Sequence, residues 1–308
     1  MILLLVMLSL LSGGSTEVVQ NFEMECGEFG DFFYYGIAPT VLYDPEFPER
    51  YTQICQTLYD TQYYATLYDT TNKIPVYSAY VFEGWMDCRR KSYWYIEPQL
   101  EDNNQGINME RWDRWVTYQA SNEDYRTVSN IFDKGHLAPV YQANSQGCSD
   151  ATFTLTNAAP QYRSFNRGQW KKVENDMAST VEGRCEDSTA FIVTGVVPGN
   201  NVINNRVSVP SHFWTAYCCK ELITNRLISG GVIGVNSEDN VTPHQRSVKR
   251  LERRLKYLYN VQSFSLFYDG CRNAYYVPVT IPKQRRPNIS QHCILSSMPC
   301  SRHKDLLF

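Results

Sequence analysis

The chain has 308 residues, of which 43% are hydrophobic and 20% are charged. This balance is typical of a folded globular protein, and it excludes an intrinsically disordered chain or a fibrous repeat. The net charge of −3 is unevenly distributed, since residues 1–63 carry −8 and residues 64–308 carry +5. A polyanionic partner would therefore be attracted to the body of the protein and not to its N-terminal segment.

The first 15 residues are predicted to be a signal peptide. Residues 1–11 are apolar except for Ser9, and small residues follow at positions 12–15, which is the pattern of a secretory leader with a cleavage site. The apolar run is shorter than the roughly 20 residues of a transmembrane helix. A buried N-terminal strand is the alternative. No later window is apolar enough to span a membrane, so we expect a secreted, extracellular protein without a membrane anchor.

Residues 16–62 are expected to form an acidic, loop-rich segment held by a disulfide bond. Three prolines interrupt it, and Cys26 and Cys55 are near enough in sequence to suggest a pair. The chain has ten cysteines, an even number that fits disulfides in an oxidising compartment. A zinc site is disfavoured because no Cys-x-x-Cys pair is present. Proximity also suggests a Cys293–Cys300 pair.

Residues 63–130 are predicted to contain a hairpin and a long connection. β-forming residues alternate between positions 63 and 82 on both sides of a turn at 69–73. Residues 97–130 are polar and show no clear period, which indicates a connection with short helices. The hairpin is expected to open the main domain, residues 63–281, and the absence of an internal repeat favours one domain.

The densest cluster of reactive side chains lies at residues 133–174. We predict a strand that ends at His136, a second strand at 151–156 and, after a turn, a helix that starts near Ser164 or Phe165. Gly135 lets another segment approach the backbone beside His136. We expect the imidazole at an exposed strand end, where its ordinary pKa of about 6.5 suits a base near neutral pH.

Asn166 and Glu174 are the candidate metal-binding residues of this unit. In a regular helix, a separation of eight residues places both on one side, about 12 Å apart along the axis. Glu174 is therefore expected to act through a bridging water. Mg²⁺ is commonly held by few protein oxygens and several waters, and Mn²⁺ is an alternative. Together with His136 and nearby cations, the cluster suggests hydrolysis of phosphodiester bonds. The cations are Lys134, Arg163, Arg167, Lys171 and Lys172.

Three buried strands, at 191–197, 207–219 and 227–235, are expected in the C-terminal half. Their short connections predict an antiparallel sheet, and with the predicted helices they indicate an α+β fold. Thr242-Pro243 predicts a helix start. The following helix is strongly basic, so its outer face is either a solvated surface or a patch for a polyanion.

A C-terminal tail at residues 282–308 is expected to be tied down by disulfides. Two N-x-S/T triplets, at Asn240 and Asn288, suggest a glycoprotein. The remaining histidines lack the company of other reactive groups and are assigned no role: His212, His244, His292 and His303.

Several motifs resemble those of a known family. D-K-G-H at 133–136, T-N-A-A-P-Q at 156–161 and F-N-R-G-Q-W at 165–170 resemble the DNA/RNA non-specific endonucleases with a ββα-metal (His-Me finger) site. Within that family, the chain most resembles the vertebrate endonuclease domain-containing 1 proteins. Further matches, such as E-P-Q at 97–99, extend the resemblance over roughly residues 22–265. It implies a mainly antiparallel central sheet flanked by helices, with the ββα-metal motif.

The resemblance implies a role for each matching residue. His136 would be the general base that activates water, and Asn166 would be the sole direct protein ligand of the metal. Glu174 would order the water shell of the metal, and Asn157 would support the site from the turn after the second strand. The candidate contacts to nucleic acid are three cations: Lys134, Arg163 and Arg167.

The chain departs from the family pattern at positions that bind phosphate. Lys134 stands where the family usually has arginine, which keeps the charge but loses the bidentate fork. Ala178 stands where an arginine usually follows the motif glutamate. An upstream arginine matches only loosely to Arg89, Arg90 or Lys91.

The sequence as a whole predicts a secreted, metal-dependent endonuclease. It would hydrolyse DNA, RNA or both with little sequence specificity. One alternative is a secreted protein that keeps the fold but binds without efficient catalysis, and another is a small-nucleotide phosphodiesterase on the same fold.

Overall fold

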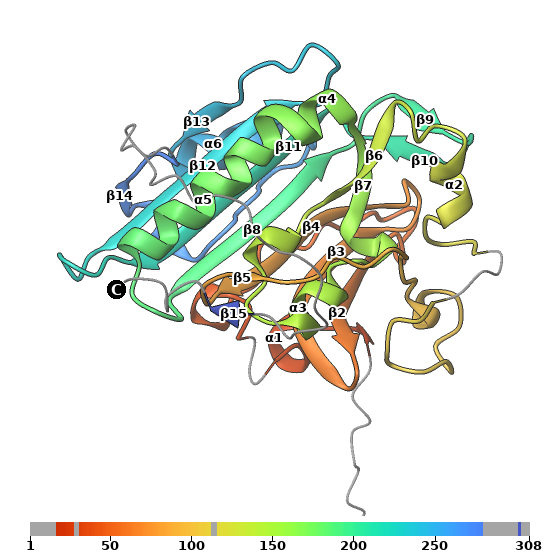
Figure 1. Ribbon diagram of the computed structural model, residues 1–308, viewed down its shortest axis with the longest axis horizontal. Helices are drawn as coiled ribbons and strands as arrows, with labels where there is room; N and C mark the ends of the chain where they lie inside the picture. The colour runs from red at the N-terminus through yellow and green to blue at the C-terminus, as the bar shows by residue number, and fades with distance from the viewer. Residues whose placement is uncertain (1–16, 28–30, 112–115, 280–300, 303–308) are drawn as a thin grey trace, which may run out of the picture.

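The protein is described by a computed structural model over residues 17–27, 31–111, 116–279 and 301–302. Its main element is a sheet of nine strands among these residues (Figure 1). Eight strands follow one another in the order β1 (Val18–Val19), β2 (Tyr51–Leu58), β3 (Thr61–Asp69), β4 (Ile74–Phe82), β8 (Ala190–Val197), β11 (His212–Lys220), β12 (Leu227–Val235) and β13 (His244–Arg246). All of these neighbours pair antiparallel, and β14 (Tyr275–Tyr276) pairs parallel with β12. The α+β fold with a mainly antiparallel sheet is therefore confirmed.

The predicted hairpin and the three predicted strands form the centre of this sheet. β3 and β4 are the two arms of the hairpin, and β8, β11 and β12 pair in the expected order. The segment 207–219 is, however, two strands. β10 (Val207–Val209) pairs with β9 (Asn201–Ile203), and β11 begins only after Pro210, which has no N–H to donate to a continuous ladder.

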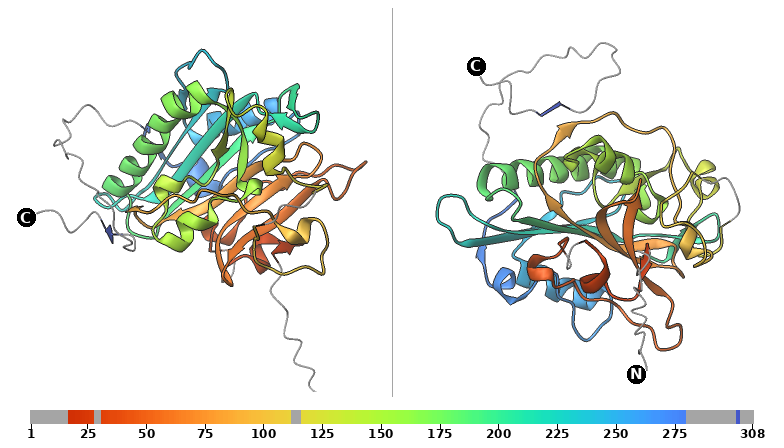
Figure 2. Two further views of the ribbon diagram at one scale, coloured as in Figure 1. Left: turned by 45° about the vertical axis from the view of Figure 1, so that its right-hand side comes forward. Right: turned by 90° about the horizontal axis from the view of Figure 1, so that it is seen from below.

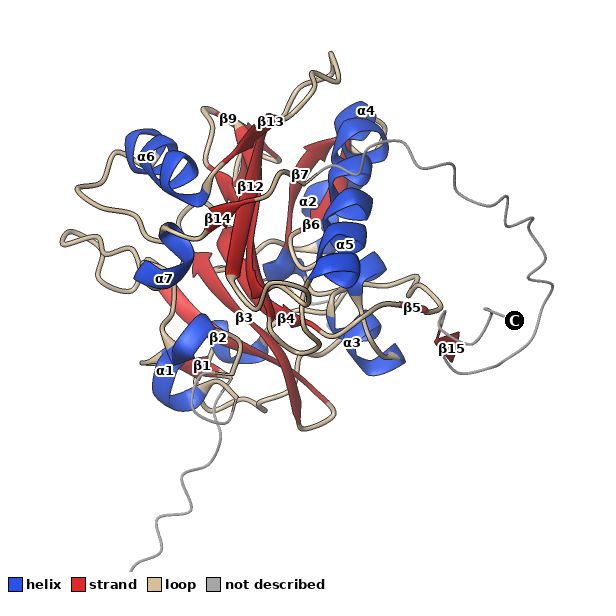
Figure 3. Cartoon of the chain, turned by 90° about the vertical axis from the view of Figure 1, so that its left-hand side faces the viewer, coloured by secondary structure: helices blue, strands red, loops and turns tan. Residues whose placement is uncertain are grey.

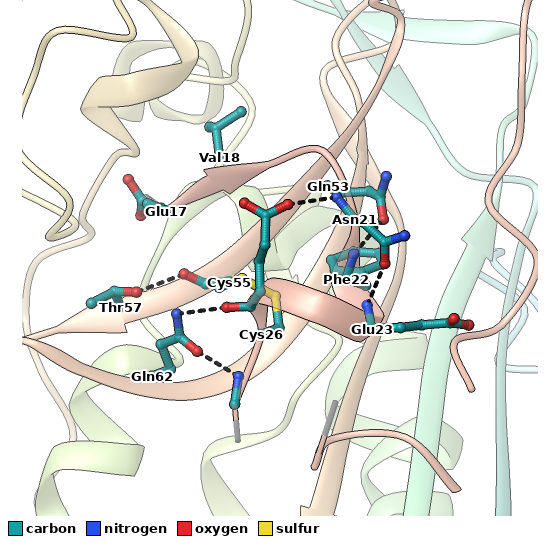
Figure 4. The surroundings of a disulfide bond; sticks show 12 residues. Glu17, Val18, Asn21, Phe22, Glu23, Cys26, Gln53, Cys55, Thr57 and Gln62 are labelled. Atoms are coloured by element: carbon teal, nitrogen blue, oxygen red, sulfur yellow. Dashed lines mark hydrogen bonds between the residues drawn. A yellow bond between two sulfur atoms is a disulfide. The ribbon is translucent and has the colours of Figure 1, made fainter. Parts of the chain in front are cut away.

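The N-terminal segment is hydrogen-bonded into the sheet through β1 and β2. It also contains α1 (Phe22–Glu25) and the 3₁₀ turn η1 (Tyr34–Gly36). The predicted Cys26–Cys55 disulfide is confirmed and joins the end of α1 to β2 (Figure 4). Beside it, Gln62 accepts a hydrogen bond from the Gly27 amide and donates one to the Glu25 carbonyl. Strand pairing and the disulfide thus attach this segment to the body.

Two more disulfides lie in the C-terminal half, Cys185–Cys219 and Cys218–Cys271. Adjacent cysteines of β11 point to opposite faces of the sheet, so each fixes a different element to the same strand. The predicted signal peptide, the Cys293–Cys300 pair and most of the predicted tail lie outside the described residues. The two described tail residues, β15 (Ser301–Arg302), pair with β5 (Met86–Asp87).

The connection between β4 and β8 carries the expected short helices and the ββα unit. The first part contains η2 (Pro98–Leu100) and α2 (Asn122–Arg126), and the second contains η3 (Val140–Gln142), α3 (Gln146–Ala151) and η4 (Leu155–Asn157). The ββα unit consists of β6 (Phe132–His136), β7 (Ala158–Tyr162) and a helical run of α4 (Arg163–Phe165), η5 (Asn166–Trp170) and α5 (Lys171–Arg184).

Helices cover the two faces of the sheet. The ββα unit and α3 lie on one face, and α6 (Val248–Leu258), α7 (Asp269–Arg272) and α1 lie on the other (Figure 3). Figure 2 shows the same separation of α5 from α1 and α6 from further directions. Each face has its own hydrophobic core, with Trp170 and Phe213 in the first and Trp214 and Leu251 in the second.

The predicted helix start at Thr242-Pro243 is wrong by five residues. Residues 244–246 form β13, which pairs with β12, and α6 begins at Val248 after Ser247. The Gln245 side chain also exchanges two hydrogen bonds with the backbone of Val279. These long-range bonds outweigh the local signal of the Thr-Pro pair. Across the described ranges, no helix combines the length and apolar character needed to cross a membrane.

Candidate active site

The ββα unit uses a different second strand from the one expected. β6 pairs antiparallel with β7, so that His136 lies opposite Ala158. Residues 151–156 were predicted to be this strand, but they complete α3 and enter η4. The Ser145 hydroxyl accepts a hydrogen bond from the Cys148 amide and starts α3, which carries the chain past the predicted strand start. Asn157 therefore precedes the second strand and does not follow it.

A π-helical turn interrupts the helix of the unit. Asn166 begins this turn, and Gly168 inside it has non-helical φ and ψ of −104° and −107°. A Cβ atom at Gly168 would lie 2.6 Å from Oδ1 of Asn240, the same oxygen that accepts a hydrogen bond from the Gln169 amide at 3.0 Å. The rotation of a regular helix therefore does not relate Asn166 to Glu174. Single π turns often occur at functional sites.

A cleft of about 980 Å³ brings most of the predicted site residues together. His136, Asn166, Glu174, Lys134 and Arg167 all line it. Asn157 and Arg163 are not among its lining residues. Aromatic and basic side chains from the connection after β4 complete the wall: Arg90, Lys91 and Trp94.

His136 is more enclosed than the sequence suggested. Its imidazole lies 4.6 Å from the ring of Trp94 and 5.0 Å from that of Phe153, measured between centroids. Its Nε2 atom is buried and has no hydrogen-bond partner among the described residues. Burial, with the charges of Arg90 and Lys134, lowers the pKa of His136 to about 3. The expectation of an exposed imidazole with an ordinary pKa was wrong, and the ring is neutral at physiological pH.

Gly135 has the role that the sequence predicted. A Cβ atom at this position would collide with the side chain of Gln161 on β7. The absence of a side chain therefore lets the two strands pair closely next to His136.

Asp133 holds two of the candidate residues in place. Its carboxylate accepts a hydrogen bond from Asn166 Nδ2 at 2.9 Å and two from the Arg167 guanidinium at 2.8 and 2.7 Å. These bonds outweigh the effect of burial and lower the pKa of Asp133. Because Asn166 Nδ2 is bonded to Asp133, Oδ1 of Asn166 is the atom left to coordinate a cation or accept a hydrogen bond. Sequence reasoning gave Asp133 no role, although it opens the D-K-G-H string.

The cations of the cleft are held in different ways. Lys134 donates to Asn122 Oδ1 at 3.0 Å and lies 5.4 Å from the ring centroids of Trp94 and Tyr125. Burial lowers its pKa to about 8. Arg163 instead donates to the carbonyls of residues 129 and 130, so its guanidinium is used within the fold.

Arg90 is the upstream cation best placed to act in the site. Its guanidinium lies 5.3 Å from the ring centroid of Phe153, and its charge affects the pKa of both His136 and Glu174. Lys91 forms an ion pair with Asp150 at 2.8 Å, and Arg89 does not line the cleft. Of the three positions that could match the upstream arginine of the family, Arg90 is therefore the best candidate.

Burial also governs the state of Glu174. It raises the pKa of this carboxyl to about 8, against the opposing charges of Arg90 and Lys171. A cation bound nearby would favour the carboxylate form. Four residues further along α5, Ala178 is buried in the core. The position where the family usually has an arginine therefore faces the interior of this protein.

Asn157 supports the site from behind. It is fully buried, and its Oδ1 accepts hydrogen bonds from the Ser78 hydroxyl and the Ala138 amide, both at 2.9 Å. Its Nδ2 donates to the carbonyls of Ala138 and Thr152 at 3.0 Å. These four bonds fix the chain just after His136 to the sheet. Both atoms of its amide group are used in these bonds, which suits Asn157 to holding the chain in position.

The sequence matches the family of DNA/RNA non-specific endonucleases over residues 48–261. The chain belongs to this family. It is 31% identical to the Endonuclease domain-containing 1 protein of Homo sapiens over 202 residues, which are 63% of this chain and 39% of that protein. It is 25% identical to the Salivary endonuclease of Lutzomyia longipalpis over 180 residues, 50% of this chain and 41% of that protein.

The chain spans about two fifths of the length of these two relatives. Among solved structures, it is similar to one described as the crystal structure of the EndoG/EndoGI complex. That similarity has a TM-score of 0.47 at 19% identity, over 65% of this chain and 82% of the other.

Proposed function

We propose that the chain is a secreted, metal-dependent endonuclease that hydrolyses phosphodiester bonds in DNA, RNA or both with little sequence specificity. The observation that carries this proposal is the single cleft shared by His136, Asn166 and Glu174, with Lys134 and Arg167 on its walls. Membership of a family of DNA/RNA endonucleases supports the same substrate class. The cations suit the phosphate backbone, which is recognised without regard to sequence.

His136 is the proposed general base. Its neutral imidazole can accept a proton from water, but burial and the charges of Arg90 and Lys134 lower its pKa to about 3, which makes it a weak base. A bound phosphate would offset these two positive charges and raise the pKa of His136 toward its ordinary value. The base would then be strengthened by the substrate on which it acts.

Asn166 and Glu174 are proposed to hold a divalent cation. Asn166 offers Oδ1 because Asp133 occupies its Nδ2, and Glu174 lines the same cleft. Within the described residues, no group of three or more His, Cys, Asp or Glu is arranged to hold a metal. Oxygen donors in small number fit Mg²⁺, which keeps several waters and uses substrate phosphates, and Mn²⁺ is the alternative. A bound cation would stabilise negative charge on the phosphate.

Secretion is part of the proposal and rests on two independent features. The predicted leader at residues 1–15 would direct the chain to the secretory pathway. The disulfides Cys26–Cys55, Cys185–Cys219 and Cys218–Cys271 are typical of an oxidising compartment. Glycosylation at Asn240 stays a prediction.

The proposal is tested by incubating the secreted protein with supercoiled plasmid and with RNA, in Mg²⁺, in Mn²⁺ and in EDTA. We expect cleavage that needs the metal and is lost in His136→Ala. Arg90→Ala should also reduce cleavage, while Arg89→Ala, next to it but outside the cleft, is the matched control and should not.

One observation favours a second candidate function. Lys134 and Ala178 leave the cleft with fewer arginines than the family pattern has, and Ala178 faces the core. A folded preparation that binds nucleic acid but leaves it intact in both metals would support a binding protein on the same fold and refute the endonuclease.

A further inference from the structure

A second cationic surface lies on α6. Its outward-facing positions carry five exposed bases: Lys249, Arg250, Arg253, Arg254 and Lys256. The only acid of the helix, Glu252, is buried; it accepts a hydrogen bond from the Leu266 amide and pairs with Arg272 at 3.0 Å. None of the five bases forms an ion pair with another described residue. The exposed face of α6 therefore carries positive charge and no negative charge.

A pocket of about 430 Å³ adjoins this helix. His212, His244, Arg246 and Arg254 line it, together with Ile233 and Val235. The lining residues come from four elements, β11, β12, β13 and α6, and they include no acid. The charge of Arg254 adds to burial in lowering the pKa of His212. A hollow with two arginines and two histidines is suited to the phosphate groups of a polyanion.

Exposed aromatic rings lie among these cations. Tyr257 is 75% exposed, and the Arg254 guanidinium lies 5.5 Å from its ring centroid. Tyr276 is 38% exposed; burial raises its pKa, and the nearby charges of Arg246 and Arg250 oppose that rise. Aromatic rings interleaved with cations are the features by which proteins bind single-stranded nucleic acid, because bases stack on the rings while phosphates meet the cations.

This surface is separate from the cleft. Val248, Leu251 and Leu255 of α6 pack into the core on one side of the sheet, whereas Trp170 and Met177 of the ββα unit pack on the other. Figure 3 shows α6 and α5 on opposite faces. A strand that reaches both must pass around the edge of the sheet. A flexible single strand can do this at little cost, whereas a duplex, with a persistence length of about 150 base pairs, would have to be bent at a cost of several kcal/mol.

We propose that the α6 surface, defined by Arg246, Lys249, Arg250, Arg253, Arg254, Lys256, Tyr257 and Tyr276, is a second binding site for single-stranded nucleic acid. The inference rests on the proposed function, since it takes nucleic acid as the ligand. The α6 surface would retain long single strands, whereas a short strand would contact only the cleft on the other face.

The test measures binding of fluorescent oligonucleotides by anisotropy in a His136→Ala background, which prevents cleavage. The oligonucleotides are single strands of about 10 and about 40 nucleotides, the shorter within the span of a single site. Combined substitution Lys249→Gln, Arg250→Gln and Arg254→Gln should weaken binding of the longer strand by at least about 10-fold and lower the salt slope by about 2, since each phosphate contact contributes about 0.7 for single strands.

A matched control removes three cations elsewhere. Arg184→Gln, Lys220→Gln and Arg226→Gln neutralise the same amount of charge, and two of these residues are already paired with Glu221 and Glu186. This variant should bind the longer strand within about 3-fold of the parent, because removing three charges away from the α6 surface weakens only the overall electrostatic attraction. All exposed substitutions are checked by thermal unfolding.

Three results would overturn the inference. They are equal losses in the two triple variants, equal binding of a 40-base-pair duplex and the longer single strand, and preference for a sulfated glycan over nucleic acid.

The proposed function fails separately. If the unmutated protein cleaves nothing but the α6 variant still loses binding, the endonuclease is refuted and the second site stands. If cleavage is normal and binding is unchanged, only the second site is refuted.

Discussion

The two faces of the sheet differ in how several of their positive charges are held. On the face of the ββα unit, Arg167 is held by Asp133, Lys134 by Asn122 and two aromatic rings, and Lys91 by Asp150. On the other face, the exposed bases of α6 have no acidic partner among the described residues, because Glu252 is turned into the core.

The difference shows how each surface could act on the same polyanion. Fixed cations keep their position when a phosphate arrives, so they can orient a bond for reaction with little reorganisation. Unpaired, solvated cations attract the polymer and release counterions, which contributes to affinity but not to geometry. Both the ββα unit and α6 are rich in basic residues, so the sequence alone does not separate the two roles. The partners of these basic side chains in the structure do.

The largest expected effect comes from removing the proposed metal ligand. Asn166→Ala should lower metal-dependent cleavage by at least about 100-fold, because metal stabilisation of transition-state charge is worth several kcal/mol and each 1.36 kcal/mol is tenfold. The measurement is the initial rate of plasmid and RNA cleavage across a Mg²⁺ titration.

The fold should survive this change. Asn166 caps α4 through its backbone N–H, which alanine keeps, and its side chain donates to Asp133. The loss of this one hydrogen bond to a carboxylate should cost about 1.5–3 kcal/mol at most. A folded Asn166→Ala protein with undiminished cleavage would remove Asn166 from the site. In contrast, the variant with Lys249→Gln, Arg250→Gln and Arg254→Gln should cleave short substrates at the wild-type rate.

A smaller effect is expected from loosening the cations of the cleft. Asp133→Asn keeps the shape of the side chain but removes the charge that holds Arg167 and Asn166. We expect metal affinity to fall about 10-fold or more, since partners that orient a ligand commonly contribute 10–100-fold. Calorimetric titration with Mg²⁺ or Mn²⁺ measures this directly, without the need for cleavage.

The matched control for this variant is Glu221→Gln. Glu221 also pairs with an arginine, Arg184, at 3.2 Å, but away from the cleft. Equal metal affinity in wild type and Asp133→Asn would show that the carboxylate does not orient the metal-binding residue, and the contrast between fixed and free cations would lose its functional meaning.

Local sequence patterns predicted most of the sheet and the unit that carries the site. Alternating residues identified the β3–β4 hairpin, and buried runs identified β8, β11 and β12. The second strand of the ββα unit was misplaced for two reasons. The Ser145 cap of α3 is a local signal that the prediction did not use. The buried bonds of Thr154 and Thr156 to Glu97 join segments distant in sequence, so they have no signature in a short window.

The site was predicted by residue type but not by environment. The sequence named His136, Asn166 and Glu174, and the cleft holds all three. It could not foresee that Trp94, some forty positions upstream, would cover the imidazole, nor that Asn240, after the last long strand, would shape the π turn at Gly168. Both effects come from segments distant in sequence, and they alter the pKa of His136 and the placement of Asn166.

An effect on stability, and not on activity, is expected from comparing one buried glutamate from each face. Glu97, behind the ββα unit, accepts bonds from the Thr154 and Thr156 hydroxyls at 2.6 and 2.8 Å and has no ion pair among the described residues. Burial raises its pKa to about 7. On the α6 face, burial also raises the pKa of Glu252, but this carboxyl pairs with Arg272.

The sign of the pH dependence follows from the raised pKa. The folded state binds the proton of Glu97 more tightly than the unfolded state, so its contribution to stability is fully present below the ordinary pKa of 4.5 and is lost as pH rises to about 7. The wild type should therefore lose up to roughly 3 kcal/mol relative to Glu97→Gln between pH 4.5 and pH 8, at 1.36 kcal/mol per pKa unit. Urea unfolding at several pH values, with the disulfides intact, measures this difference.

Glu252→Gln provides the contrast for Glu97→Gln. It should lower stability at neutral pH, because the Leu266 amide and Arg272 lose their charged acceptor. A constant stability difference between wild type and Glu97→Gln across this pH range would mean that Glu97 keeps an ordinary pKa in the folded protein.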